Sequence, residues 1–151
     1  MSLDRRADIA NDENVTYFIS LHNNSFSDPD AGGFETYIYE GPVYLNTVKW
    51  RDIIHSRLAK FVGGYGVKDR GMKRANFAVL RETAMPTLLI EMAFITNPRE
   101  LSLLKNETFL DGFAREMAVA LAEIFGLKLF SITVHVIFST LPLQIGAGKK
   151  G

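Results

Sequence analysis

"VTYFISLHNNSF", residues 15–26, is the stretch that decides the fold of this 151-residue chain. Its first seven residues are β-branched, aromatic or aliphatic at nearly every position, which is typical of a strand covered on both faces. The apolar run ends on His22, and Asn23 and Asn24 follow it directly. Because ligands of open α/β sheets collect at the carboxyl ends of strands, the pattern predicts a functional site beginning at His22.

Further elements are expected on the carboxyl side of this strand. They are a strand at 34–39, a helix from 44 to about 62, a loop at 67–74, strands at 76–81 and 87–94, a short helix at 98–104 capped by Asn97, and a long amphipathic helix opened by Thr108 and Asp111 and ended by Gly126. Strands that alternate with helices over short connections predict a layered α/β fold, with helices on both faces of the sheet. Residues 1–128 are expected to form this single domain, and residues 129–151 a strand-like tail with a loose end.

Charge and cysteine content exclude several functions. Seventeen basic residues balance seventeen acidic ones, so no strong field holds nucleic acid, and no nucleic-acid partner is expected. The chain has no cysteine, so a zinc ion would need His, Asp or Glu ligands.

Neither end of the chain resembles a membrane segment. No run reaches the roughly 20 apolar residues that span a bilayer, and Met1 to Asp12 lacks the apolar core of a secretory signal peptide. The apolar segment 129–141 is either an added edge strand or an appendage foreign to the domain.

Glu91 is the first candidate catalytic residue. It interrupts the apolar run 87–94, and burial there would raise its pKa toward the range useful to a general acid or base. The alternative is a half-exposed strand that turns Glu91 to water.

His22 is the candidate metal ligand, and the alternative is a histidine that is merely hydrogen-bonded at a strand end. His55 and His135 have no ligand spacing to His22, and the chain contains neither HExxH nor GxSxG. Spacing alone therefore identifies no enzyme.

Four basic residues and two asparagines have open roles. Lys68, Arg70, Lys73 and Arg74 either hold anionic substrate groups or form a solvated loop. Asn23 and Asn24 either orient substrate or shape a turn.

Several stretches taken together resemble the zinc-dependent N-acetylmuramoyl-L-alanine amidases of the amidase 3 family. They are "FISLHNNSF", "GGFETYIY", "DRGMKRANFAVLRETAMPTLLIEMAFITNPRE" and the last long helix, in order from about residue 3 to 130. The resemblance implies that His22, in a Ser-x-His-x-Asn segment, binds zinc, and that Glu91, in an Ile-Glu-x-x-Phe setting, is the catalytic carboxylate. Asn23 stands where alanine is usual.

The family pattern also includes an Asp-Pro-Gly-His loop and a helical glutamate as zinc ligands, and the chain has no match to either. The resemblance therefore implies a domain that is incomplete at its N-terminus and holds one ligand, His22, of the three that a catalytic zinc takes. A sheet that lacks its first strands exposes an edge, so self-association through that edge is expected unless segment 129–141 fills the gap.

The implied activity is hydrolysis of the amide between N-acetylmuramic acid and the L-alanine of peptidoglycan, outside the cell or in the cell wall. Zinc would activate a water molecule, and Glu91 would move its proton to the departing nitrogen. The alternative is an inactive domain on the same scaffold that binds muropeptide or a protein.

Overall fold

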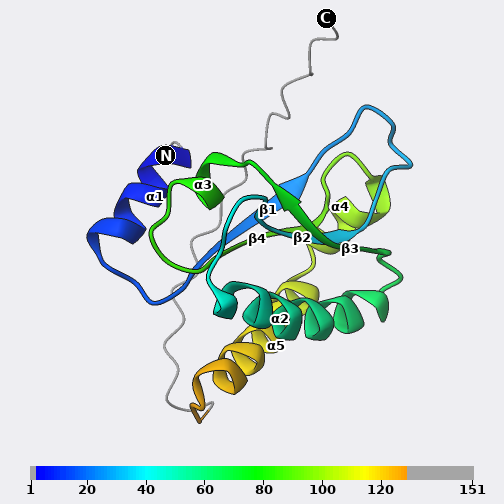
Figure 1. The fold of residues 1–151 in the computed structure, drawn as a ribbon. Coiled ribbons are helices and arrows are strands. Elements are labelled where there is room, and N and C mark those ends of the chain that lie inside the picture. The colour runs from blue at the N-terminus through cyan, green and yellow to red at the C-terminus, as the bar shows by residue number, and fades with distance from the viewer. Residues whose placement is uncertain (1–2, 129–151) are drawn as a thin grey trace, which may run out of the picture.

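The sheet at the centre of the molecule contains four strands among the residues that the computed structural model describes, which are residues 3–128. The strands are β1 (Phe18–Asn24), β2 (Phe34–Tyr39), β3 (Asp69–Ala75) and β4 (Thr87–Phe94), in the order β1-β4-β2-β3 (Figure 1). β1 and β4 are parallel, β2 is antiparallel to β4, and β3 is parallel to β2. The sheet is thus mixed: β1 and β4 bring their carboxyl ends to one edge, and β2 and β3 bring theirs to the opposite edge.

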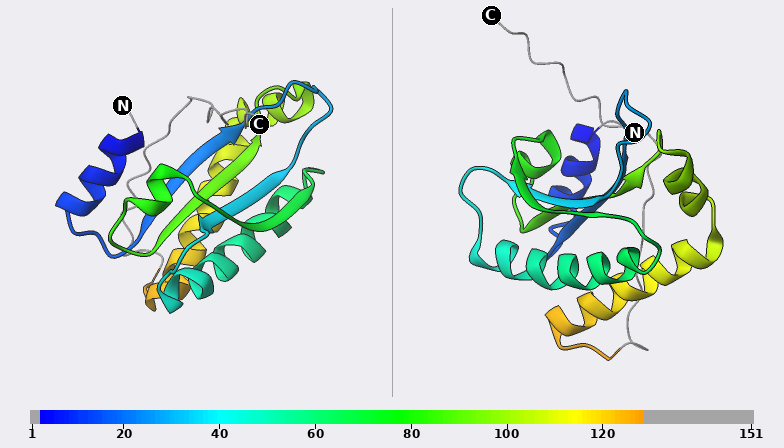
Figure 2. Two further views of the ribbon diagram at one scale, coloured as in Figure 1. Left: turned by 45° about the horizontal axis from the view of Figure 1, so that its top comes forward. Right: turned by 90° about the vertical axis from the view of Figure 1, so that its right-hand side faces the viewer.

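Helices cover both faces of this sheet, as the sequence predicts. α2 (Leu45–Gly63) and α5 (Glu107–Phe125) lie on one face, and α1 (Leu3–Asp12) and α3 (Ala78–Arg81) lie on the other (Figure 2). α4 (Pro98–Leu104) follows the end of β4. The predicted tail at 129–151, and with it the domain boundary at residue 128, falls outside the described residues.

The hydrophobic core lies between the sheet and the pair α2 and α5. Alternate residues of β4 point into it, and Leu88 and Ile90 are fully buried there. Phe109 and Phe113 of α5 pack against the same cluster. Since strand side chains alternate between faces, the residues between the core positions, Glu91 among them, point to the opposite face.

The caps of the last two helices explain where they begin. The Asn97 side chain accepts hydrogen bonds from the backbone N–H groups of Arg99 and Glu100, and Pro98 takes the first helical position of α4, as predicted. The predicted start of α5 is wrong, because Asn106 caps this helix by accepting from the Phe109 N–H. Gly126 ends α5 in the left-handed conformation, at φ 62°.

Two segments between α2 and β4 differ from the prediction. The expected loop at 67–74 contains β3, whose side chains are charged and largely exposed, and the expected strand at 76–81 contains the short helix α3. β3 forms because β2 offers it a free row of backbone hydrogen-bonding groups, which no propensity of its own residues reveals. A four-residue apolar run does not by its periodicity distinguish a strand from a helix.

The amino-terminal region also differs. Helix α1 was not predicted, and its buried residues among positions 5–12 are the small residues Ala7 and Ala10. β1 begins three residues later than expected and continues to Asn24, so His22 lies within the strand.

The two edges of the described sheet differ in charge. β3 carries Asp69, Arg70, Lys73 and Arg74, and such charges oppose pairing with another strand, whereas β1 carries no Asp, Glu, Lys or Arg.

Self-association therefore stays a prediction, and β1 is the edge expected to mediate it. Sedimentation velocity at several protein concentrations will show a concentration-dependent dimer, and a monomer at every concentration would contradict the prediction.

No helix within residues 3–128 combines the length and the apolar character needed to cross a lipid bilayer.

Candidate active site

His22 and Glu91, the two site residues predicted from the sequence, lie side by side. β1 and β4 are neighbours (Figure 1), and His22 is the register partner of Glu91. Parallel strands direct paired side chains to the same face, and this is the face opposite α2 and α5. Both residues are 2% exposed, so the alternative of a water-facing Glu91 is wrong.

The His22 ring is held at one nitrogen and unpartnered at the other. Nε2 lies 2.7 Å from Ser20 Oγ, while Nδ1 is buried and has no hydrogen-bond partner. Burial, reinforced by the nearby positive charge of Arg6, lowers the His22 pKa to about 4, so the imidazole is neutral at pH 7. With the proton on Nε2, the lone pair lies on Nδ1, which is the arrangement a metal ligand requires.

Glu91 has the environment of a proton-transfer group. Its Oε2 atom is buried and has no hydrogen-bond partner. Burial raises the Glu91 pKa to about 8, and the negative charge of Glu35 contributes to the rise. A carboxyl group with a pKa near the ambient pH both accepts and donates a proton readily.

Glu35, which sequence reasoning missed, completes the row on this face. It lies opposite Glu91 in the antiparallel register of β2 and β4 and is 1% exposed. Oε1 accepts hydrogen bonds from Asn24 Nδ2 at 2.7 Å and the Tyr37 hydroxyl at 2.9 Å. Oε2 accepts from Arg70 Nε at 2.9 Å and from Lys73 Nζ. No oxygen of Glu35 is therefore left for substrate.

The two carboxyl groups in this row titrate in opposite directions. Burial alone would raise the Glu35 pKa, but the hydrogen bonds from Lys73, Arg70 and Tyr37 outweigh it and hold this pKa below its usual value. Glu91 has no such donors, and its pKa rises. When the pKa values of neighbouring carboxyl groups are shifted in opposite directions, the group that retains its proton is the candidate acid or base. The sequence predicted a strand at 34–39, which contains Glu35. The available signal for the role of Glu35 was a glutamate in a strand together with a basic segment later in the chain.

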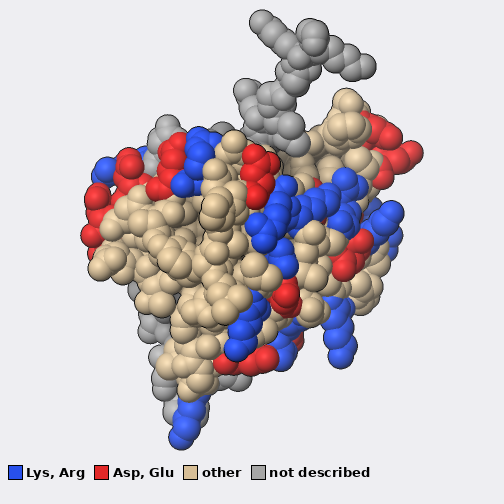
Figure 3. Space-filling model, in the orientation of Figure 1, with Lys and Arg blue, Asp and Glu red and all other residues tan. Residues whose placement is uncertain are grey.

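The basic cluster divides into two parts. Arg70 and Lys73 bind Glu35, whereas Arg74 donates to the backbone carbonyls of Tyr39 and Gly41, and Lys68 is exposed. Figure 3 shows lysine and arginine side chains gathered over β2 and β3. The predicted solvated loop is thus a charged edge strand.

The two asparagines after His22 differ in role. Asn24 donates to Glu35 and also accepts from the backbone N–H of Ser25, so it links β1 to β2 and shapes the following turn. Asn23 Oδ1 is buried without a partner.

His55 lies apart from the site, on the other face of the sheet. Its Nδ1 is 2.8 Å from Thr36 Oγ1 and its Nε2 is 3.1 Å from Asp69 Oδ1. His135 falls outside the described residues.

The described residues supply one candidate ligand of a zinc site, His22. The unpartnered Nδ1 of His22 suits a metal, but nowhere in residues 3–128 do three or more His, Asp or Glu side chains gather to hold one. A catalytic zinc takes three protein ligands, so this part of the chain does not complete the set.

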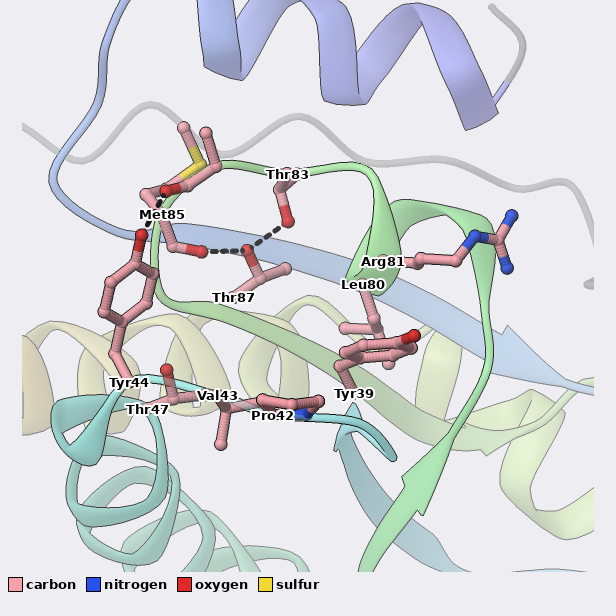
Figure 4. A pocket seen from close by; sticks show the side chains of 11 residues that line it. Tyr39, Pro42, Val43, Tyr44, Thr47, Leu80, Arg81, Thr83, Met85 and Thr87 are labelled. Carbon is pink, nitrogen blue, oxygen red and sulfur yellow. Dashed lines mark hydrogen bonds between the residues drawn. The ribbon is translucent and has the colours of Figure 1, made fainter.

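A separate pocket of about 420 Å³ opens near the start of β4 (Figure 4). Its lining includes Tyr39, Tyr44, Thr83 and Thr87; the Tyr44 hydroxyl donates to the Ala84 carbonyl, and the two threonine hydroxyls share a hydrogen bond of 2.6 Å. Thr87 precedes Glu91 by four residues, a separation of roughly 13 Å along a strand. The pocket is therefore distinct from the pair formed by His22 and Glu91.

Comparison with known sequences identifies relatives over most of the chain. The family profile described as N-acetylmuramoyl-L-alanine amidase (Amidase_3) matches residues 1–123. The N-acetylmuramoyl-L-alanine amidase CwlM of Bacillus licheniformis is 43% identical over 128 residues, which are 85% of this chain and 48% of the relative. The sporulation-specific N-acetylmuramoyl-L-alanine amidase of Bacillus subtilis (strain 168) is 38% identical over 149 residues, 99% of this chain and 54% of the relative.

Solved structures agree with these sequences. The catalytic domain of the amidase CwlV from Bacillus (Paenibacillus) polymyxa var. colistinus superimposes with a TM-score of 0.75 at 29% identity, covering 85% of this chain and 68% of that one. The N-acetylmuramoyl-L-alanine amidase of Clostridium difficile 630 gives a TM-score of 0.76 at 30% identity, covering 83% and 66%. The chain spans about half the length of the curated relatives it matches. Because the profile covers most of its residues, the chain belongs to the amidase 3 family of N-acetylmuramoyl-L-alanine amidases.

Proposed function

We propose that this chain carries the proton-transfer glutamate and one zinc ligand of a peptidoglycan amidase. The reaction is hydrolysis of the amide between N-acetylmuramic acid and the L-alanine of the stem peptide, at the cell wall. The observation that supports it is the register pairing of His22 with Glu91, each with one buried polar atom that has no partner. Unpartnered buried polar atoms are costly, and a substrate or an ion that satisfies them is the usual compensation.

Glu91 performs the proton transfers. Its carboxylate accepts a proton from the attacking water while the water oxygen bonds to the carbonyl carbon, and the same carboxyl group then donates that proton to the L-alanine nitrogen as the C–N bond breaks. The products are the lactyl carboxylic acid and a free amine. With a pKa of about 8, roughly a tenth of Glu91 is ionised at pH 7, and a cation bound at His22 would increase this fraction.

His22 would be a zinc ligand through its unpartnered Nδ1 atom. A zinc ion bound there would supply polarisation of the scissile carbonyl and of the water. Ser20 would hold the ring with Nδ1 directed at the metal, because its hydroxyl engages Nε2.

Digestion of purified cell-wall sacculi tests the proposal. The chain supplied with zinc is expected to release new amino-terminal L-alanine and no new reducing sugar ends, and His22→Ala is expected to reduce the release at least tenfold because one ligand is lost. His55→Gln is the matched control, since His55 lies on the other face, and it should retain both zinc binding and release.

Metal analysis and a binding assay complete this test. If the chain holds no zinc, leaves sacculi intact and still binds muropeptides, it is the binding module named as the alternative, and the hydrolase proposal is wrong for this chain.

A further inference from the structure

The charges around Glu35 leave an excess of positive charge at the surface. Arg70 and Lys73 both pair with this one buried carboxylate. The Glu35 side chain is 2% exposed, whereas the side chains of Arg70 and Lys73 are 36% and 34% exposed. Two cations thus share one anion that lies beneath them, and one positive charge remains without a counter-charge in this group.

Both cations are held in place before any ligand binds. Arg70 donates through Nε to Glu35 and through Nη1 to the Gly32 carbonyl at 3.3 Å, and its guanidinium lies 5.1 Å from the centre of the Phe94 ring. Lys73 Nζ lies 5.7 Å from the centre of the Tyr37 ring. Such fixed side chains lose little conformational entropy when a ligand arrives.

Donor groups of both side chains remain available to a ligand. Arg70 Nη2 makes no hydrogen bond to any residue in the described range, and the Lys73 ammonium uses one of its three N–H groups there, on Glu35. A guanidinium beside an ammonium matches the two oxygens of a carboxylate, which form short, charge-assisted hydrogen bonds with such groups.

The distance to Glu91 fits a substrate group near the reacting bond. Residues paired across antiparallel strands have Cβ atoms about 5 Å apart, and Glu35 is the partner of Glu91. Successive residues of a peptide are about 3.8 Å apart. Arg70 and Lys73 contact Glu35, so the second residue of a peptide whose first amide lies at Glu91 comes within reach of this group.

We propose that Arg70 and Lys73 form a carboxylate subsite for the acidic second residue of the stem peptide, held in position by Glu35. This inference rests on the proposed function, because it takes the stem peptide as the substrate. The subsite selects peptides whose second residue carries a free carboxylate over those in which this group is an amide.

Binding of two synthetic muropeptides tests the subsite. Both ligands are N-acetylmuramoyl-L-alanyl-D-glutamate with the γ-carboxyl group blocked as a methylamide; one keeps its α-carboxylate free, and in the other this group is an amide. Each is titrated calorimetrically into the Glu91→Gln chain, which prevents turnover. The carboxylate form is expected to bind about tenfold more tightly. Lys73→Met in the same background should remove this preference, while Lys73→Arg should retain it because the charge remains.

Lys60→Met is the matched control, since Lys60 is an exposed lysine of α2 on the opposite face, and it should leave the tenfold preference unchanged. Equal binding of both ligands, or a preference that survives Lys73→Met, would overturn the subsite. Sacculus hydrolysis without the preference leaves the proposed function standing and removes the subsite. A preference for the carboxylate ligand without sacculus hydrolysis leaves the subsite standing and removes the proposed function. Binding of neither ligand contradicts both proposals.

Discussion

Glu91→Gln is expected to stabilise the metal-free protein by about 5 kcal/mol at pH 9 and to leave its stability unchanged at pH 4. The reason is the raised pKa of Glu91, about 8 in the folded chain against a usual 4.5. Below pH 4.5 the group is protonated in both states. Between pH 4.5 and 8 the folded state retains a proton that the unfolded state releases, so the stability of the unsubstituted protein falls as the pH rises. Above pH 8 a buried charge remains, and glutamine removes it.

Urea unfolding at pH 4, 6 and 9 in the presence of a chelator measures this effect. The difference in unfolding free energy between the two proteins should grow through this window and level off above pH 8. Glu40→Gln, at an exposed position, should show no such trend. A difference that does not vary with pH would mean that Glu91 is not buried as a neutral acid.

The same substitution is expected to reduce amide hydrolysis by 10² to 10⁴, the usual contribution of a general acid or base. Glutamine keeps the size and hydrogen-bonding shape of the side chain but neither accepts nor donates the proton. A gain in stability combined with a loss of activity separates a chemical role from a structural one, because loss of a merely structural residue would lower both.

Glu35→Ala is expected to destabilise the protein by about 3 kcal/mol, because several hydrogen-bond donors lose their acceptor. The substitution leaves Asn24 Nδ2 and the Tyr37 hydroxyl without their acceptor. Arg70 and Lys73 lose their counter-charge, but they are about one-third exposed and are partly rehydrated. Most of the loss therefore comes from the two neutral donors, the buried Asn24 amide and the part-buried Tyr37 hydroxyl.

Thermal or urea unfolding at pH 7 measures this loss, with Glu82→Ala as the control. Glu82 pairs with Arg81 at 2.7 Å, but both side chains are more than 40% exposed, and the cost should stay below about 1 kcal/mol. Because the Glu35 pKa lies below its usual value, the contribution of Glu35 is present above pH 4.5 and is lost as the pH falls through the folded-state pKa. Equal costs for the two substitutions would show that the network around Glu35 does not support the fold.

Elements with a local cause could be predicted from the sequence. β2 and β4 are short segments rich in aromatic, aliphatic and β-branched residues and bounded by turn residues, and the start of α4 is set by a capping asparagine followed by proline. β3 could not be predicted, because its charged residues pair only with the free edge of β2. α1 was not predicted because most of its residues are charged or polar, so no apolar run marks the segment, and its buried residues Ala7 and Ala10 are small.

The candidate site divides in the same way. The sequence by itself determined that His22 and Glu91 interrupt apolar strands, because a polar residue in such a run is visible without any partner. Only the tertiary structure decided that β4 lies between β1 and β2, which places His22, Glu91 and Glu35 in one row. Strand order and register depend on contacts between distant segments, and the sequence of each strand carries no record of its neighbours. The opposite pKa shifts of Glu91 and Glu35 follow from that row, because one carboxyl group is desolvated there while the other is held by two cations.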